Sequence, residues 1–375
     1  RIPIIQAPMV GASDSSMAMA VGKAGGLGSL PCATISVTNA RDEINKIRSG
    51  QRENQPLNLN FFSHKPEVCT IEHHQQWLSA LDRYYKEENL EAILPDLESV
   101  PKRAPFGDEM CLLVEEMRPE VVSFHFGLPS PPLLDRVKNA GSFLLGCATT
   151  VQEARWLHAN GVDGIIAQGY EAGGHRGNFL TQDLAAQPGT LALVPQCVDA
   201  VGNEIPVIAA GGIADGRGIA AAIMLGASAV QIGTSYLFSK ESTVSSVHMA
   251  ELRQASDSCT VLTNIFSGKP ARGIACRLVQ EMGAISRAVP PYPDAGVALK
   301  QLQNRAEQQG RADFSMMWCG QSAGLCAARA KQAEHERKKA RDPVIAGDDP
   351  CFVESATDMT NRLADEAQSC LGAMG

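Results

Sequence analysis

The sequence lacks an excess of positive charge and lacks long apolar runs. Its 33 lysines and arginines stand against 41 aspartates and glutamates, which gives a formal net charge of −8. Such a chain offers no basic field for nucleic-acid phosphates or anionic lipids. Glycine, serine or a charged residue interrupts every apolar stretch well before the roughly 20 residues that a membrane-spanning helix requires. We therefore expect neither a nucleic-acid partner nor a membrane segment.

The usual signatures of disulfide frameworks, metal sites and two common enzyme classes are also missing. The 11 cysteines include no Cys-x-x-Cys pair, and the histidines follow no metal-ligand spacing. We expect a reducing, cytoplasmic compartment and no metal. No Gly-x-Ser-x-Gly elbow and no Walker-type loop is present, which argues against serine hydrolases and P-loop nucleotidases.

What the 375 residues do contain is enough apolar material, 44%, for a large core. Short β-rich runs alternate with helix-like segments, as in βα units around a parallel sheet. Eight such units favour an α/β fold of the (β/α)8 TIM-barrel type over an open sheet. The predicted strands are Ile2–Ala7, Gly26–Leu30, Leu57–Phe62, Val121–Gly127, Phe143–Thr149, Gly164–Gly169, Pro206–Gly212 and Ala229–Thr234.

The spacing of these runs predicts the domain organisation. Residues 1–245 would form the barrel, with an insertion at about 63–120 that packs helices over the barrel mouth. Residues 246–330 would form a smaller, mainly helical cap that contributes to substrate binding. Residues 331–375 would form a helical tail to which the sequence assigns no role.

Two glycine-containing loops are candidates for a phosphate site. In a TIM barrel the loops after strands 7 and 8 commonly hold phosphate. Gly211 and Gly212 follow strand 7 and precede a helix, whose N-terminus would present free N–H groups. Gln231, Gly233 and Thr234 lie at the end of strand 8. The same glycines could simply form tight βα turns.

Other strand ends offer groups that suit a flat cofactor ring. Pro8 and Met9 form an apolar turn after strand 1, and Asn60 places an amide at the end of strand 3. Gln168 ends strand 6 and could hydrogen-bond a heteroaromatic ring edge. The glycine-rich loop that follows, with Gly173 and Gly174, could cover the cofactor, although any single amide is more often an ordinary loop residue.

His125 and His175 both fall at strand ends or in the loops just beyond, and therefore at the predicted mouth. A histidine of near-neutral pKa is a natural base for removing a proton from carbon beside an electron-withdrawing group. A lone histidine is usually structural, but two at one mouth favour catalysis.

Taken together, these stretches resemble the nitronate monooxygenase family, most closely its class I. The resemblance covers most of residues 1–330. It is carried by Gln6-Ala-Pro-Met9, Asn58-Leu-Asn-Phe-Phe62, Ser123-Phe-His-Phe-Gly127, Ala167-Gln-Gly-Tyr-Glu-Ala-Gly-Gly-His-Arg-Gly177, Ala209-Ala-Gly-Gly-Ile-Ala-Asp-Gly-Arg-Gly218 and Val230-Gln-Ile-Gly-Thr234.

The resemblance implies an FMN-bound oxidoreductase that uses O2 to oxidise alkyl nitronates, with propionate 3-nitronate as the expected substrate, to a carbonyl compound plus nitrite and nitrate. It implies that His175 is the catalytic base, that His125 is a second active-site histidine, and that Tyr292 and Lys300 bind substrate. One departure is Gly296, where the class I pattern has a tyrosine. FMN would contact Pro8, Met9, Asn60, Gln168, Gly173, Gly174, Gly211, Gly212, Gln231, Gly233 and Thr234.

Two other functions remain open on the sequence alone. The first is an FMN-dependent reductase of the same superfamily that uses NAD(P)H to reduce an enoyl thioester or a quinone. The second is a flavin-free barrel that binds a phosphate ligand or isomerises a sugar phosphate. The oligomeric state is not indicated by any sequence feature.

Overall fold

The computed structural model describes residues 3–50, 55–96, 103–202, 204–340 and 354–373. All eight predicted strands are present, and β7 (Gly174–His175) is an additional strand outside the barrel. The first residue of the first predicted strand, Ile2, lies outside the described ranges. The barrel strands are β1 (Ile4–Gln6), β2 (Gly28–Pro31), β3 (Leu57–Phe62), β4 (Val121–His125), β5 (Phe143–Ala148), β6 (Gly164–Gln168), β8 (Val207–Ala210) and β9 (Ala229–Ile232).

These strands form a closed parallel barrel. Their order in the sheet is β1-β9-β8-β6-β5-β4-β3-β2, and every neighbouring pair is parallel. A parallel bridge between Ile5 and Leu27 joins the two ends, and the Gln6 N–H donates to the Leu27 carbonyl at 2.9 Å. The predicted (β/α)8 fold is confirmed.

Strand alternation separates the barrel interior from the helix-covered exterior. One buried cluster fills the interior and contains Ile5, Leu145, Cys147, Ile166, Ile208 and Ala210. Their sequence neighbours, such as Ile4 and Leu144, belong to the larger core between strands and helices. Because successive side chains point to opposite faces, later interior positions on the same strands reach the carboxyl ends. There the interior becomes polar.

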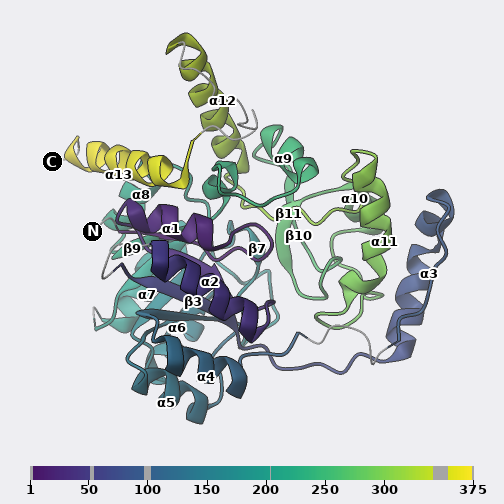
Figure 1. The fold of residues 1–375 in the computed structure, drawn as a ribbon, viewed down its shortest axis with the longest axis horizontal. Coiled ribbons are helices and arrows are strands. Elements are labelled where there is room, and N and C mark those ends of the chain that lie inside the picture. The colour runs from purple at the N-terminus through teal and green to yellow at the C-terminus, as the bar shows by residue number, and fades with distance from the viewer. Residues whose placement is uncertain (1–2, 51–54, 97–102, 203, 341–353, 374–375) are drawn as a thin grey trace.

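Helices surround the barrel, and the last of them, α13, comes from the C-terminal tail (Figure 1). Helix α13 packs against both α8 and α1, so it fills the gap left after β9. Buried Thr360 on α13 hydrogen-bonds the Tyr236 hydroxyl at 2.8 Å, and Thr357 donates to the Ala20 carbonyl. The outer helices are α1 (Ser15–Lys23), α2 (Val37–Gly50), α4 (Asp108–Met117), α5 (Pro131–Asn139), α6 (Val151–Ala159), α7 (Thr190–Val201), α8 (Gly216–Met224) and α13 (Ala356–Gly372).

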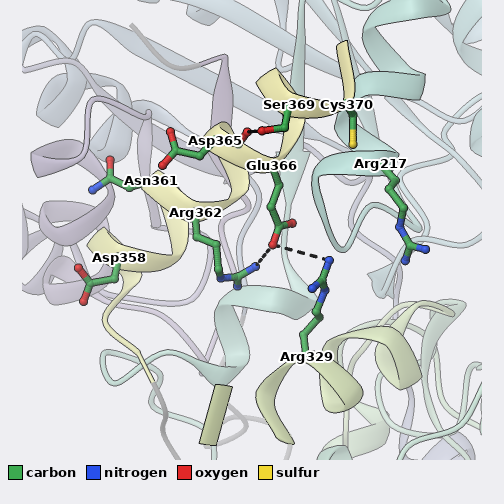
Figure 2. Close-up of a pocket in the computed structure, with 9 residues that line it drawn as sticks. All are labelled: Arg217, Arg329, Asp358, Asn361, Arg362, Asp365, Glu366, Ser369 and Cys370. Carbon is green, nitrogen blue, oxygen red and sulfur yellow. Dashed lines mark hydrogen bonds and ion pairs between the residues drawn. The ribbon is translucent and has the colours of Figure 1, made fainter. Parts of the chain in front are cut away.

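A surface hollow of about 640 Å³ lies where α13 meets α8. Figure 2 shows Glu366 pointing between Arg329 and Arg362, at 3.7 and 3.1 Å. Arg217 pairs with Asp215 at 2.6 Å. Since each of these arginines has a carboxylate partner, the hollow is an ion-pair network that attaches α13 rather than an anion site.

The cap is inserted between β9 and α13, which makes α13 the delayed last helix of the barrel. Its sheet runs β10-β11-β7 and is antiparallel. Through β7, the loop after β6 therefore belongs to both domains. The cap elements are η1 (Thr234–Phe238), α9 (Ser246–Arg253), β10 (Thr260–Thr263), β11 (Ala271–Ile274), α10 (Arg277–Met282), α11 (Ala295–Gln308) and α12 (Ala323–Ala340).

The insertion after β3 divides between the two domains. Helix α4 takes a place in the outer ring beside α5, whereas α3 (Ile71–Glu87) packs on α11. Buried Trp77 donates to the Ala295 carbonyl at 3.0 Å, and Tyr85 donates to the Ala298 carbonyl at 2.5 Å. Figure 1 shows α3 at the edge of the molecule beside α11. The expectation that insertion helices lie over the barrel mouth stays a prediction; the described contacts place α4 beside α5 and α3 on the cap helix α11. The large apolar residues of α3 find their partner on the cap.

Residues 97–102 of the insertion and 341–353 of the tail, to which parts of the sequence expectations apply, lie outside the described residues. None of the described helices is both long and apolar enough to cross a membrane.

Candidate active site

Polar side chains occupy the interior positions at the carboxyl ends of the strands. Asn60 on β3 donates from Nδ2 to the Ser123 hydroxyl on β4 at 3.0 Å. Gln231 on β9 is half-buried, and its Oε1 is enclosed without a hydrogen-bond partner among the described residues. A buried orphan acceptor at the barrel mouth indicates a place where a ligand can donate a hydrogen bond.

Gln168 holds the loop after β6 in place. Its Nε2 donates to the His175 carbonyl at 3.0 Å, and its Oε1 accepts from the Gly177 N–H at 2.8 Å. Both ends of the amide are therefore satisfied within the protein. The predicted contact of Gln168 with a ring edge stays a prediction, because an amide with one hydrogen bond at each end keeps a second N–H and a second oxygen lone pair.

Arg176 fixes the same loop from the inside. It is 1% exposed and donates to the Gln168 and Gly169 carbonyls and to the Gln187 side chain. Burial lowers the pKa of Arg176 to about 10, which still leaves the guanidinium charged at neutral pH. A buried guanidinium with all three nitrogens hydrogen-bonded is well suited to fix the residue next to it, His175.

The structure brings His125 and His175 together. His125 Nε2 lies 3.1 Å from the His175 carbonyl oxygen, and His175 Nε2 lies 2.8 Å from Ser267 Oγ. Burial lowers the pKa of His175 to about 3 and that of His125 to about 4. Both imidazoles are therefore neutral at physiological pH, which is the form that can accept a proton.

Aromatic rings surround His175. The ring centroids of Trp318, Tyr292, Phe126 and Phe62 lie 5.7, 5.8, 5.9 and 6.3 Å from that of His175. Phe126 adopts φ +68°, a left-handed conformation that is strained for a bulky residue. In this conformation the Phe126 ring faces that of His175. The result is an apolar enclosure around a single proton acceptor.

Positive charge comes from residues that the sequence analysis did not single out. Lys269 Nζ lies 5.4 Å from the Phe126 ring centroid and 5.8 Å from that of Tyr292, and it pairs with Glu67 at 3.5 Å. Together with Arg103, it helps to lower the pKa of His175. Lys269 falls in the β10–β11 loop, 94 residues beyond His175 in the numbering, so no local pattern marks it.

The predicted substrate residues Tyr292 and Lys300 differ in their surroundings. Tyr292 is 2% exposed; burial raises the pKa of its hydroxyl, and Arg103, which faces that hydroxyl, partly offsets the rise. Lys300 is exposed on α11 and contacts neither Tyr292 nor His175 by any hydrogen bond or ion pair in the described part of the chain. Between them, a Cβ added to Gly296 would lie 3.2 Å from the Phe266 carbonyl oxygen.

The glycine-rich loops meet on one side of the mouth. A Cβ on Gly211 would come within 3.0 Å of the Ala172 nitrogen, and one on Gly173 within 2.5 Å of Gly320. The Gly320 N–H in turn donates to Thr234 Oγ1 at 2.9 Å. Gly212, Gly233 and Thr234 donate no backbone hydrogen bond to any oxygen of the described chain. These N–H groups are available to an anion.

The N-terminus of α8 is not available in the same way, contrary to the sequence expectation. The Asp215 carboxylate accepts from the N–H groups of Arg217 and Gly218, and Glu366 of α13 accepts from Gly216 at 3.0 Å. Two carboxylates therefore occupy the position predicted for phosphate. The sequence could not indicate this, because Glu366 comes from the tail, 150 residues away.

The remaining predicted contacts flank these loops. Met9 and Gly233 are adjacent, since a Cβ on Gly233 would lie 3.6 Å from Met9 Sδ. Pro8 is half-buried beside Met9. Gly174 adopts φ +69° with open space where a side chain would be. The mouth therefore combines open N–H groups, an apolar turn and an enclosed histidine.

A second cluster lies outside this mouth. Cys69, His74 and Asp294 place one potential ligand atom each within 4.8 Å of one another, and they are the one such group of three in the described ranges. The sequence analysis expected no metal because it found no metal-ligand spacing. Asp294 is more than 200 residues from the other two, so local spacing could not show this group.

The fold defines an α/β barrel with a polar mouth at the carboxyl ends of its strands. Residues 1–333 match the family model described as nitronate monooxygenase. The chain belongs to the nitronate monooxygenase family, a family of flavoenzymes. The predicted resemblance is confirmed.

Individual relatives support this family assignment. A nitronate monooxygenase of Pseudomonas aeruginosa is 40% identical over 328 residues, covering 86% of this chain and 91% of the relative. One from Paraburkholderia phytofirmans is 39% identical over 345 residues, covering 90% and 92%. The solved structure of a nitroalkane oxidase from Streptomyces ansochromogenes has a TM-score of 0.82 at 32% identity and covers 100% of this chain and 98% of its own. FabK from Thermotoga maritima has a TM-score of 0.68 at 26% identity and covers 100% and 94%.

Proposed function

We propose that this protein is an FMN-dependent nitronate monooxygenase that uses O2 to oxidise alkyl nitronates, giving a carbonyl compound with nitrite and nitrate. A nitronate that carries a carboxylate, such as propionate 3-nitronate, is the substrate that best fits the charges at the mouth. The observation that carries the proposal is the enclosed, neutral His175 with Lys269 beside its aromatic surround.

The residues present fit FMN. Gln231 has a buried acceptor without a partner, and a ring N–H could satisfy it. The free N–H groups of Gly212, Gly233 and Thr234 suit one monophosphate. Pro8, Met9 and Asn60 would line the ring, and Gly173, Gly174 and Gly211 allow close approach of the backbone. When bound, FMN supplies the redox chemistry between the nitronate and O2.

The hydrogen bonds of Ser267 assign the proton on His175. Ser267 Oγ donates to the Lys269 carbonyl at 3.2 Å and therefore accepts from the Nε2–H of His175. That tautomer leaves the Nδ1 lone pair as the base. On a neutral nitroalkane, Nδ1 would take the α-proton. A preformed nitronate has already lost that proton, so it needs His175 only for positioning.

The cations serve the substrate's negative charge. Lys269 and Arg103 approach the mouth from the cap and from the insertion, and Arg103 faces the Tyr292 hydroxyl there. We assign Lys269, Arg103 and Tyr292 to the carboxylate or nitronate of the substrate. Lys300, the residue implied by the resemblance, is exposed and would contribute less.

Purified protein tests the proposal. It should be yellow and release FMN rather than FAD on heating, as identified by chromatography, and it should consume O2 when propionate 3-nitronate is added. Release of FAD, or well-folded protein without flavin, would contradict the cofactor assignment. FMN without any nitronate turnover would favour the reductase alternative, which is compatible with the likeness to FabK.

A further inference from the structure

The three side chains of the second cluster come from two parts of the chain that pack together. Cys69 lies two residues before α3, His74 lies in the first turn of α3, and Asp294 directly precedes α11. Cys69 Sγ lies 3.4 Å from His74 Nε2, and all three ligand atoms fall within 4.8 Å of one another. In a tetrahedral zinc site with bonds of about 2.0–2.3 Å, neighbouring ligand atoms are separated by about 3.5 Å.

The surrounding structure holds these side chains in position before any ion arrives. His74 is completely buried, while Cys69 and Asp294 are half-buried, so the cluster is closed on one side and reached by solvent on the other. The hydrogen bonds from Trp77 and Tyr85 to the α11 backbone fix α3 against α11 on the same side. Preorganised ligands lower the cost of assembling a metal site.

Asp294 is placed unusually for a residue at a helix N-terminus. An aspartate in that position normally accepts a hydrogen bond from a backbone N–H of the first turn, but the Asp294 carboxylate makes no such bond. It lies beside the Cys69 thiol and the His74 imidazole instead. The carboxylate is therefore available as a third ligand.

We propose that Cys69, His74 and Asp294 bind one Zn²⁺ ion, with water in the fourth position. The donor set of sulfur, imidazole nitrogen and carboxylate oxygen favours Zn²⁺ over Mg²⁺ or Ca²⁺, which prefer oxygen ligands only. On binding, the thiol releases its proton to solvent. One thiolate and one carboxylate then neutralise the two charges of the ion, so the bound site carries no net charge.

The site would clamp α3 to the start of α11. Asp294 is two residues from Tyr292, whose ring lies beside His175. A bound ion would therefore hold the turn that carries Tyr292. This role is structural, and it does not depend on which substrate the barrel oxidises.

Zinc affinity tests the site directly. The flavin-loaded protein is titrated with Zn²⁺ in competition with a colorimetric chelator, and we expect one ion per chain. Cys69→Ser and Asp294→Asn should each weaken binding by about 100-fold or more, because each removes a ligand. His73→Gln, at the adjacent residue, and Cys370→Ser, at a half-buried cysteine on α13, are matched controls that should bind as wild type does.

Cobalt identifies the ligand atom. Co²⁺ added to wild-type protein should produce a thiolate-to-metal charge-transfer band in the difference spectrum, and Cys69→Ser should abolish it. Zn²⁺ should also raise the Tm of wild-type protein but not that of Asp294→Asn. Wild-type protein that binds no stoichiometric Zn²⁺, or a cobalt band that persists in Cys69→Ser, would overturn the proposal. Neither result would affect the proposed oxidation of nitronates.

Discussion

His175 Nε2 lies 2.8 Å from the hydroxyl oxygen of Ser267, which itself donates to the Lys269 carbonyl. We assign the proton of His175 to Nε2 on this basis, since a Ser267 hydroxyl that donates to Lys269 accepts from the histidine. Ser267 belongs to the segment between β10 and β11, so the cap orients a histidine carried by the loop after a barrel strand. The barrel and the cap together position His175, the proposed base.

The first prediction separates proton transfer from binding. His175→Asn should lose about 10²- to 10⁴-fold more activity on a neutral nitroalkane than on the preformed nitronate, because only the former needs the base. His125→Asn is the comparison and should lose activity on both substrates more evenly. The measurement is the ratio of kcat/KM values for the two substrates, at constant FMN content. Equal losses on both substrates for His175→Asn would reassign it to binding.

The second prediction concerns substrate charge. Lys269→Met should raise the KM for propionate 3-nitronate by about 10- to 150-fold, since a charge-assisted contact is worth about 1.5–3 kcal/mol. An alkyl nitronate without a carboxylate should be affected less. Lys300→Met serves as the matched control, because Lys300 is an exposed lysine of the same cap. If Lys300→Met gave the larger change instead, the carboxylate would lie over α11.

The third prediction follows from three histidines whose pKa values are lowered. Burial lowers the pKa of His175 to about 3 and those of His125 and His248 to about 4. In the unfolded chain a histidine titrates near 6.5, so the unfolded state binds more protons between about pH 4 and 6.5. Stability should therefore fall as the pH drops through this window, by up to about 1.4 kcal/mol per pH unit for each histidine.

Urea unfolding at several pH values measures this slope. His248 lies outside the mouth. His248→Gln should therefore make the dependence of stability on pH shallower by the share of one histidine, without changing substrate selectivity. An identical slope in wild type and His248→Gln would show that this histidine titrates alike in both states.

The fourth prediction concerns the C-terminal helix. The family model ends at residue 333, yet α13 completes the ring of outer helices. A chain ending at residue 340 should expose apolar faces of α1 and α8 and fail to give soluble, flavin-loaded protein. Thr360→Val, which removes the buried hydrogen bond to Tyr236, should cost only about 1 kcal/mol of unfolding free energy. A soluble, active truncated chain would contradict the role assigned to α13.

Much of the barrel could be predicted from sequence because its strands are locally encoded. Runs such as 164–168 and 207–210 are almost continuously apolar and are followed by glycine, which suits strands buried on both faces. The histidines could be placed at the mouth because His125 ends such a run and His175 lies in the loop that follows one. Local pattern and global position agree there.

The parts that sequence did not predict depend on contacts between distant segments. Glu366, a residue of the tail, accepts a hydrogen bond at the N-terminus of α8, and Lys269 reaches the mouth from the cap. The hydrogen bonds of Gln168 to the His175 carbonyl and the Gly177 N–H could not be predicted, because they depend on how the loop folds back. Hydrogen bonds from Trp77 and Tyr85 join α3 to α11, and helical periodicity alone does not identify that partner.

Anaerobic mixing of the purified flavoprotein tests the central claim most directly. We expect propionate 3-nitronate to bleach the flavin absorbance within the catalytic turnover time, and NAD(P)H to leave it unchanged at equal concentration. Bleaching by NAD(P)H with no response to the nitronate would contradict the account and identify the protein as a reductase on the same barrel.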